Sequence, residues 1–200
     1  FHVDGVVGIH RVSWEDINKP DKTINASATG ILKWNNKLIV ILDFERIITD
    51  INPETGLKMS DLSHLHNRAN NNMPILIAED SPMLSKLIRD FLEKAGYTNL
   101  IMTENGAEAW AVIEKYINEG TVLEKIKCVI TDIEMPQMDG HHLTKLIKAH
   151  KELKAIPVII FSSLINAEMR IKGKSIGADA QITKPEIGTL IEVMDSLVNV

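Results

Sequence analysis

The sequence predicts an α/β fold over residues 74–200, with a five-stranded parallel sheet that helices cover on both faces. Three observations lead to this prediction. Short apolar runs rich in β-branched residues alternate five times with longer amphipathic stretches, which is typical of parallel sheets. The apolar runs are continuous, as expected for strands buried on both faces. Five such units in this length fit a doubly wound sheet.

The elements follow in order. The predicted strands span residues 74–78, 100–103, 128–131, 157–162 and 180–183. The predicted helices span residues 82–95, 106–118, 140–151, 166–176 and 186–198. Ser81 and Pro82 favour the start of the first helix, because serine caps a helix and proline suits its first position, and Gly96 suits its end. This order predicts the flavodoxin-like arrangement, with strand order 2-1-3-4-5. We interpret residues 118–127 as a surface elaboration.

The front of the chain has a different pattern. Residues 5–12 read as a strand, and two apolar runs around Asn35 and Asn36 read as a hairpin, since asparagine tolerates the positive φ of a tight turn. Residues 43–51 favour a short helix. A polar stretch then precedes the α/β region. We therefore predict a partial all-β module over 1–59, a linker over 60–73 and an α/β domain over 74–200.

Composition excludes several classes of function. The chain has 22 Lys and Arg against 27 Asp and Glu, a net charge of −5, and the two parts divided at residue 73 are both acidic. No basic face is expected, so we predict no nucleic-acid partner. No apolar run approaches the ~18 residues that span a bilayer, so we expect no direct membrane insertion. The single cysteine, Cys128, fits a reducing cytoplasm.

Polar residues stand where the predicted strands end. Glu79 and Asp80 follow the first strand and Asp132 follows the third, while Ser162 ends the fourth and Lys184 follows the fifth. Ligands of doubly wound sheets bind at the carboxyl ends of the strands. We therefore expect these five side chains to meet at one edge of the sheet.

Their chemistry indicates phosphoryl transfer. Three carboxylates on neighbouring strand ends repel one another unless a cation lies among them, and Mg²⁺ prefers oxygen ligands. A carboxylate such as Asp132 can act as a nucleophile and take a phosphoryl group as an acyl phosphate. Lys184 and the hydroxyl of Ser162 are suited to bind that group.

Four motifs carry a resemblance to a known family: ILIAEDS, VITDIEMPQMDG, PVIIFSS and GADAQITKP. With these motifs residues 74–200 resemble a response-regulator receiver domain. The resemblance implies that Asp80, Asp132 and the main-chain carbonyl of Glu134 ligate Mg²⁺, with Glu79 acting through a metal-bound water.

The resemblance also implies that Asp132 accepts phosphate from a phosphohistidine of a sensor kinase, and that Ser162 and Lys184 bind it. It implies a cis peptide bond before Pro185. Gln181 stands where most receivers carry the Tyr or Phe of their activation switch. We therefore expect phosphorylation without the aromatic half of the usual switch.

The segments HVDGVVGIHRV and ATGILKWNNKLIVILDFERII resemble the C-terminal portion of a CheW-like coupling domain. A CheW-like domain followed by a receiver is the order of CheV-type chemotaxis proteins. The resemblance implies a cytoplasmic scaffold that joins chemoreceptors to the histidine kinase CheA and is tuned by phosphorylation of Asp132. About half of such a coupling domain is visible in residues 1–59.

Two alternatives stay open. One is a stand-alone receiver that acts as a phosphate sink or response regulator, with residues 1–73 as an unrelated β appendage. The other is a Mg²⁺-dependent phosphohydrolase with Asp132 as its nucleophile. Such hydrolases usually carry a second Asp two residues later, where this chain has Glu134. We therefore expect no enzyme that turns over an external substrate.

Overall fold

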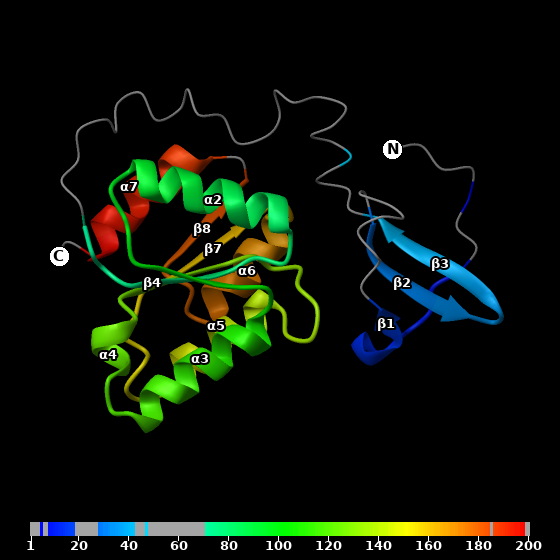
Figure 1. Cartoon of the computed structure of the whole chain (residues 1–200), viewed down its shortest axis with the longest axis horizontal. Coiled ribbons are helices and arrows are strands. Elements are labelled where there is room, and N and C mark those ends of the chain that lie inside the picture. Colours follow the sequence, from blue (N-terminus) through cyan, green and yellow to red (C-terminus); the bar gives the residue numbers. More distant parts are fainter. Residues whose placement is uncertain are drawn as a thin grey trace. The chain divides into compact units, whose positions relative to one another are not determined.

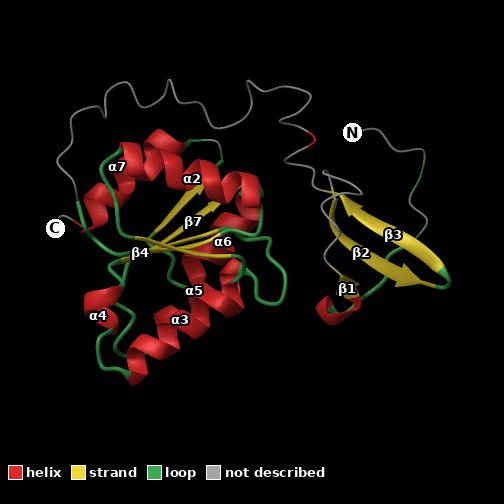
Figure 2. Cartoon of the chain, viewed as in Figure 1, coloured by secondary structure: helices red, strands yellow, loops and turns green. Residues whose placement is uncertain are grey.

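The computed structural model describes residues 5, 8–18, 28–42, 47, 71–184 and 186–198. The chain divides into two compact units, Phe1–Ile47 and Ile48–Val200. Figure 1 shows both units coloured along the sequence, and Figure 2 shows their helices and strands. In a doubly wound sheet, ligands bind at the carboxyl ends of the strands. The strand order of the second unit therefore determines which side chains can meet at such a site.

The N-terminal unit holds a three-stranded antiparallel sheet in the order β1-β2-β3. The single-turn helix η1 (Trp14–Asp16) precedes β1 (Ile17–Asn18), β2 (Ala28–Trp34) and β3 (Lys37–Leu42). Asn35 and Asn36 join β2 to β3 with φ angles of 46° and 61°. Two positive φ angles in a two-residue turn match the right-handed twist of a hairpin, which confirms the predicted hairpin.

Two other predictions for this unit, a strand over residues 5–12 and a helix over residues 43–51, are not confirmed. The predicted strand over residues 5–12 is wrong for its described residues, because residues 5 and 8–12 form no strand and are exposed. An extended segment becomes a strand only when a neighbouring strand accepts its hydrogen bonds, and the ladder of β2 pairs with β1 and β3 instead. The predicted helix over residues 43–51 lies outside the described residues, apart from Ile47.

The second unit contains a five-stranded parallel sheet in the order β5-β4-β6-β7-β8. Its strands are β4 (Ile75–Ala78), β5 (Leu100–Thr103), β6 (Cys128–Thr131), β7 (Val158–Ser162) and β8 (Ala180–Thr183). Written by position in this sheet, the order is 2-1-3-4-5, as predicted. All residues of the central strands β4, β6 and β7 are buried, which explains their unbroken apolar sequences.

Helices cover both faces of this sheet (Figure 1). They are α2 (Pro82–Lys94), α3 (Gly106–Asn118), the short α4 (Val122–Lys125), α5 (Gly140–Ala149), α6 (Ala167–Ser175) and α7 (Ile187–Val198). Buried residues of α2 and α7 pack in one apolar core, and those of α3, α4 and α5 pack in another on the opposite face. No helix in the described part of the chain has the length and apolar character to cross a membrane.

Helix α2 begins and ends as its sequence indicates. The hydroxyl of Ser81 accepts a hydrogen bond from the amide of Leu84 at 3.4 Å, and Pro82 is the first helical residue. Gly96 follows the helix with a φ of 94°. That angle lies in the left-handed region, which favours glycine and closes the helix. Both predicted ends of α2 are therefore confirmed.

The connection before β6 is more than a surface elaboration. It forms the one-turn helix α4, and the side chains of Val122 and Ile126 are buried in the core on the α3 and α5 side. The prediction of a purely surface segment is therefore wrong for these two residues. Burial of an apolar side chain lowers its free energy relative to exposure to water, and α4 places both side chains in this core.

The core makes a prediction about the single thiol of the chain. Cys128 on β6 is buried, and its burial first, with the charge of Asp179 second, raises the pKa of its thiol to about 12 from 9.0. Since the thiolate is the reactive form, we expect no reaction of the native protein with Ellman's reagent at pH 8. The same protein in concentrated urea should react fully. Rapid reaction in the native state would contradict the packing described for β6.

Candidate functional site at the carboxyl edge of the sheet

Two strand ends bring three carboxylates together. Glu79 and Asp80 directly follow β4, and Asp132 directly follows β6. Because β4 and β6 are neighbouring parallel strands, Ala78 is paired with Thr131 and the next residues emerge side by side. One carboxylate oxygen from each of these three residues lies within 4.8 Å of the others. The predicted gathering of these side chains is therefore present.

Asp132 is held by the main chain and by a lysine. One oxygen, Oδ1, accepts a hydrogen bond from the amide of Ile133 at 2.6 Å, and the other, Oδ2, accepts one from Nζ of Lys184 at 2.9 Å. The residue is 5% exposed. A carboxylate so deeply placed is costly without a compensating charge, and Lys184 provides that charge.

Lys184 also binds a second carboxylate. Its Nζ lies 2.8 Å from Oε2 of Glu79, so one ammonium group bridges Glu79 and Asp132. The other oxygen of Glu79, Oε1, accepts a hydrogen bond from the amide of Ser81 at 3.3 Å. Glu79 is 2% exposed. Both of its oxygens therefore bond to protein groups, which fixes the position of the lysine.

The other predicted residues take different places. Ser162 is buried at the end of β7, where its hydroxyl accepts a hydrogen bond from the amide of Leu164 at 3.3 Å. Glu134 is exposed, and the predicted role of its main-chain carbonyl stays a prediction. Gln181 points to helix α6, because its Nε2 donates to the carbonyl of Arg170 at 2.9 Å. Pro185, with its predicted cis peptide bond, lies outside the described residues.

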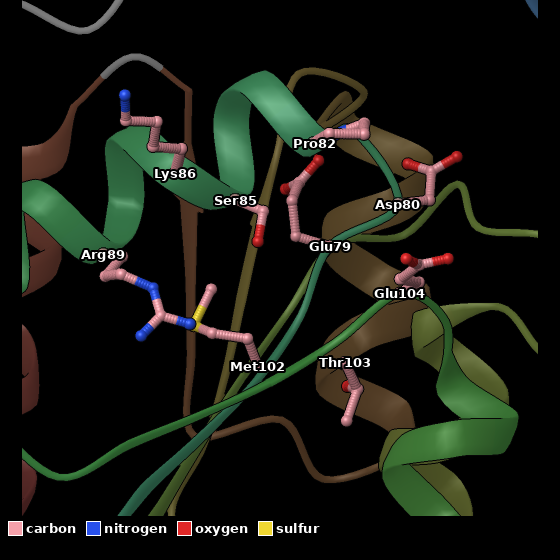
Figure 3. Close-up of a pocket in the computed structure, with 9 residues that line it drawn as sticks. All are labelled: Glu79, Asp80, Pro82, Ser85, Lys86, Arg89, Met102, Thr103 and Glu104. Atoms are coloured by element: carbon pink, nitrogen blue, oxygen red, sulfur yellow. The ribbon is translucent and has the colours of Figure 1, made fainter. Parts of the chain in front are cut away.

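A hollow of about 310 Å³ opens beside the cluster (Figure 3). It is lined by Glu79, Asp80, Pro82, Ser85, Lys86, Arg89, Met102, Thr103 and Glu104. Two of the three clustered carboxylates therefore border open space, on the side where α2 begins. Lys86 and Arg89 add positive charge to its wall, so a group that enters there meets both acidic and basic side chains.

The donor set fits a divalent cation. Three carboxylates and one ammonium group leave two formal negative charges, which a divalent cation balances. All three acidic side chains offer oxygen, the ligand type that Mg²⁺ prefers. Asp80 is only half-buried and borders the hollow, so an ion that enters the hollow can reach this residue.

Gly140 is a part of the site to which sequence reasoning gave no role. A methyl group on its Cα would lie 1.8 Å from the carbonyl oxygen of Asp132 and 2.8 Å from Oγ1 of Thr131. The first residue of α5 therefore presses directly against the main chain of Asp132. The motif MDG contained this glycine, but the close approach depends on how α5 packs, which no local pattern reveals.

This contact yields a prediction. Gly140→Ala forces two main-chain segments apart, so we expect it to lower the free energy of unfolding by about 2–3 kcal/mol. Urea denaturation followed by circular dichroism measures the loss. Gly120→Asn is the control, because no atom lies within 4 Å of a Cβ there and asparagine tolerates its φ of 69°. Equal unfolding midpoints for the two variants would contradict the close packing at Gly140.

Comparisons with known proteins agree with this geometry. A family model described as "Response regulator receiver domain" matches residues 75–195, and one described as "CheW-like domain" matches residues 1–52. The receiver domain of a signal transduction histidine kinase from Syntrophus aciditrophicus is 31% identical, with a TM-score of 0.55 over 64% of this chain and 90% of that one. These matches leave the predicted boundaries at residues 59, 60, 73 and 74 as predictions.

Chemotaxis proteins of Helicobacter pylori are similar over most of the chain. CheV3 is 28% identical over 92% of this chain and 60% of its own length. CheV2 is 31% identical over 93% of this chain and 59% of its own length. The chain thus spans less than two thirds of these curated relatives. It belongs to the response regulator receiver domain family, and its CheW-like segment followed by a receiver is the CheV-type arrangement.

Proposed function

We propose that this chain is part of a chemotaxis coupling protein that is regulated by Mg²⁺-dependent phosphorylation of Asp132. One observation carries the proposal: a buried carboxylate, Asp132, is hydrogen-bonded to Lys184 beside two further carboxylates. An ion pair with a purely structural role needs only one carboxylate for one lysine, whereas three carboxylates gather here around Lys184. The additional acidic groups next to open space support a site that receives a cation and a phosphoryl group.

The reaction follows from the side chains. A carboxylate oxygen of Asp132 forms a bond to the phosphorus of a phosphohistidine, while the bond from phosphorus to the histidine nitrogen breaks and that nitrogen regains its lone pair. Lys184 stays beside the oxygen that carries charge, because Glu79 holds its ammonium group. The hydroxyl of Ser162 supplies a further donor once it turns toward the phosphoryl group.

Four residues would hold the metal ion. We assign direct ligation to Asp80, Asp132 and the main-chain carbonyl of Glu134, and a water-mediated contact to Glu79. The balance of charge among Glu79, Asp80, Asp132 and Lys184 supports this assignment. When bound, the ion neutralises charge on the phosphoryl oxygens during transfer. Lys184, whose Nζ lies 2.9 Å from Oδ2 of Asp132, would share this task.

The partners are proposed from the CheW-like segment and the similarity to CheV2 and CheV3. We propose that the protein acts in the cytoplasm, where it couples chemoreceptors to CheA and takes its phosphoryl group from that kinase. Relatives of this kind are signalling proteins. We therefore propose that it turns over no external substrate, and that slow loss of the acyl phosphate is its only hydrolytic reaction.

The chemistry is tested with a small donor. Acetyl phosphate and Mg²⁺ should add about 80 daltons to the intact chain, the mass of one phosphoryl group. Asp132→Ala should gain nothing, and removal of Mg²⁺ with a chelator should prevent the gain in the parent protein. Asp139→Ala is the matched control, because Asp139 is exposed and caps α5, and it should be phosphorylated. An adduct on Asp132→Ala would contradict the proposal.

The partner is tested by phosphotransfer. Radiolabelled phospho-CheA from the source organism should lose its label to the intact chain within minutes. The label should stay on CheA when Asp132→Ala replaces the parent. Transfer from an unrelated sensor kinase should be far slower, since specificity depends on complementary docking. If both kinases transfer at the same rate, CheA is not the preferred donor and the chemotaxis assignment fails, whereas the acyl-phosphate chemistry survives.

A further inference from the structure

The chain in front of the receiver sheet is held by the turn between α2 and β5. The amide of Asn71 donates a hydrogen bond to the carbonyl of Gly96 at 2.7 Å, and the amide of Thr98 donates one to the carbonyl of Asn71 at 3.2 Å. These two bonds make a parallel bridge between Asn71 and Tyr97. The bridge lies beyond the ladder of β4 and β5, which begins at Ile75 on β4. The amino edge of the sheet is therefore extended by one bridge.

Side chains reinforce this bridge. Oδ1 of Asn71 accepts a hydrogen bond from the amide of Met73 at 3.0 Å, which folds the segment onto itself. Nδ2 of Asn99 donates one to the carbonyl of Asn72 at 3.3 Å. The side chain of Met73 is partly buried and packs against the apolar core that α2 and α7 share. Residues 71–73 are therefore attached to the receiver, although they lie within the stretch predicted as a linker.

The residue opposite Asn71 is also connected to the last helix. The ring of Tyr97 is 2% exposed and belongs to the core that α2 and α7 share. Its hydroxyl donates a hydrogen bond to Oδ1 of Asp195, which lies on α7. A hydrogen bond to an ionised acceptor is stronger than one between neutral groups. The main chain of Tyr97 thus pairs with Asn71, while its side chain is bonded to α7.

This attachment lies at the opposite end of β4 from the candidate site. Asn71 precedes β4, whereas Glu79 and Asp80 directly follow it. All four residues of β4 are buried and paired with both neighbouring strands, so β4 itself is held firmly. Residues 71–73 have fewer hydrogen bonds than a central strand, and Asn72 is exposed. Such a segment opens at a lower free energy than the ladder that follows it.

We propose that residues 71–73 form a strap that ties the connection between the two units to the amino edge of the receiver sheet, and that the contact of Tyr97 with Asp195 makes the closed strap depend on α7. Opening the strap frees three residues and lengthens the connection by up to about 10 Å when they are extended. The length of a connection sets the effective concentration at which one linked unit meets its binding site. The strap would therefore regulate the reach of the CheW-like segment.

Hydrogen exchange of the intact chain tests the strap. Asn71→Ala removes the acceptor of the Met73 amide, so the amides of residues 71, 73 and 98 should exchange roughly fivefold faster, as expected for one lost hydrogen bond. Asn72→Ala is the matched control, because Asn72 is exposed and is bonded through its main-chain carbonyl. It should leave these three amides unchanged. Equal exchange in Asn71→Ala and the parent protein would overturn the strap.

The same measurement tests the dependence on α7. Tyr97→Phe keeps the buried ring and removes only the hydroxyl, so the amides of residues 71, 73 and 98 should exchange about tenfold faster, because the lost bond has a charged acceptor. Tyr116→Phe makes the same change on α3, beside the other core, and should have no effect on these amides. If Asn71→Ala accelerates their exchange and Tyr97→Phe does not, the dependence on α7 is wrong.

A double-mutant cycle tests whether the two contacts act together. If the bond from Tyr97 supports the bridge to Asn71, the variant with both Asn71→Ala and Tyr97→Phe should accelerate exchange by less than the product of the two single effects. Effects that simply multiply would mean independent contacts and would overturn the dependence on α7. The strap does not rest on phosphorylation of Asp132. A parent chain that takes no phosphoryl group from acetyl phosphate would therefore overturn the proposed function alone.

The reach of the connection is tested by distances between spin labels on the intact chain. Lys37→Cys on β3 and Lys115→Cys on α3 place one label on an exposed position of each unit, and the buried Cys128 is expected to stay unlabelled. With Asn71→Ala and Tyr97→Phe added, the distribution of distances should extend to longer values. With Asn72→Ala added instead, it should match that of the labelled parent. An unchanged distribution in the first variant would overturn the effect on reach.

Discussion

One ammonium group shared by two buried carboxylates constrains the whole carboxyl edge of the receiver sheet. Lys184 lies within 3 Å of both Glu79 and Asp132, and each of these acids would be costly to bury without it. The bridge also joins three strands, since Glu79 follows β4, Asp132 follows β6 and Lys184 follows β8. Any chemistry at Oδ2 of Asp132 therefore changes a contact that joins the ends of β6 and β8.

The helices of the second unit are attached to its sheet in two different ways. Helices α2, α3, α5 and α7 bury apolar side chains in the two cores. This burial attaches them to the sheet and stabilises the domain. Helix α6 depends on an amide, a guanidinium group and a glycine. Among the residues of α6 only Gly173 is buried, so this helix contributes less to the two cores than the other helices do.

Much of the fold was predictable, because the strands of a parallel sheet are continuous apolar runs and helices follow them with recognisable caps. Glu79, Asp80, Asp132 and Lys184 were predictable for the same reason: each follows a strand, so topology alone brings them together. Two close approaches could not be predicted: that of Gly140 to the main chain of Asp132, and that of Gly173 to the side chain of Gln181. Both depend on close packing between elements distant in sequence, which leaves no periodic pattern. The strand expected over residues 5–12 failed for a related reason, because sequence cannot show whether a partner strand is available.

Location of the acyl phosphate tests the central claim most directly. Borohydride reduces an aspartyl phosphate to homoserine, so reduction after treatment with a phosphoryl donor marks the modified residue permanently. The tryptic peptide of residues 128–145 contains Asp132, Glu134 and Asp139, and fragmentation distinguishes them. Our account predicts homoserine at position 132 alone. Homoserine at position 139, a reduced side chain at position 134, or no reduced residue in this peptide would contradict it.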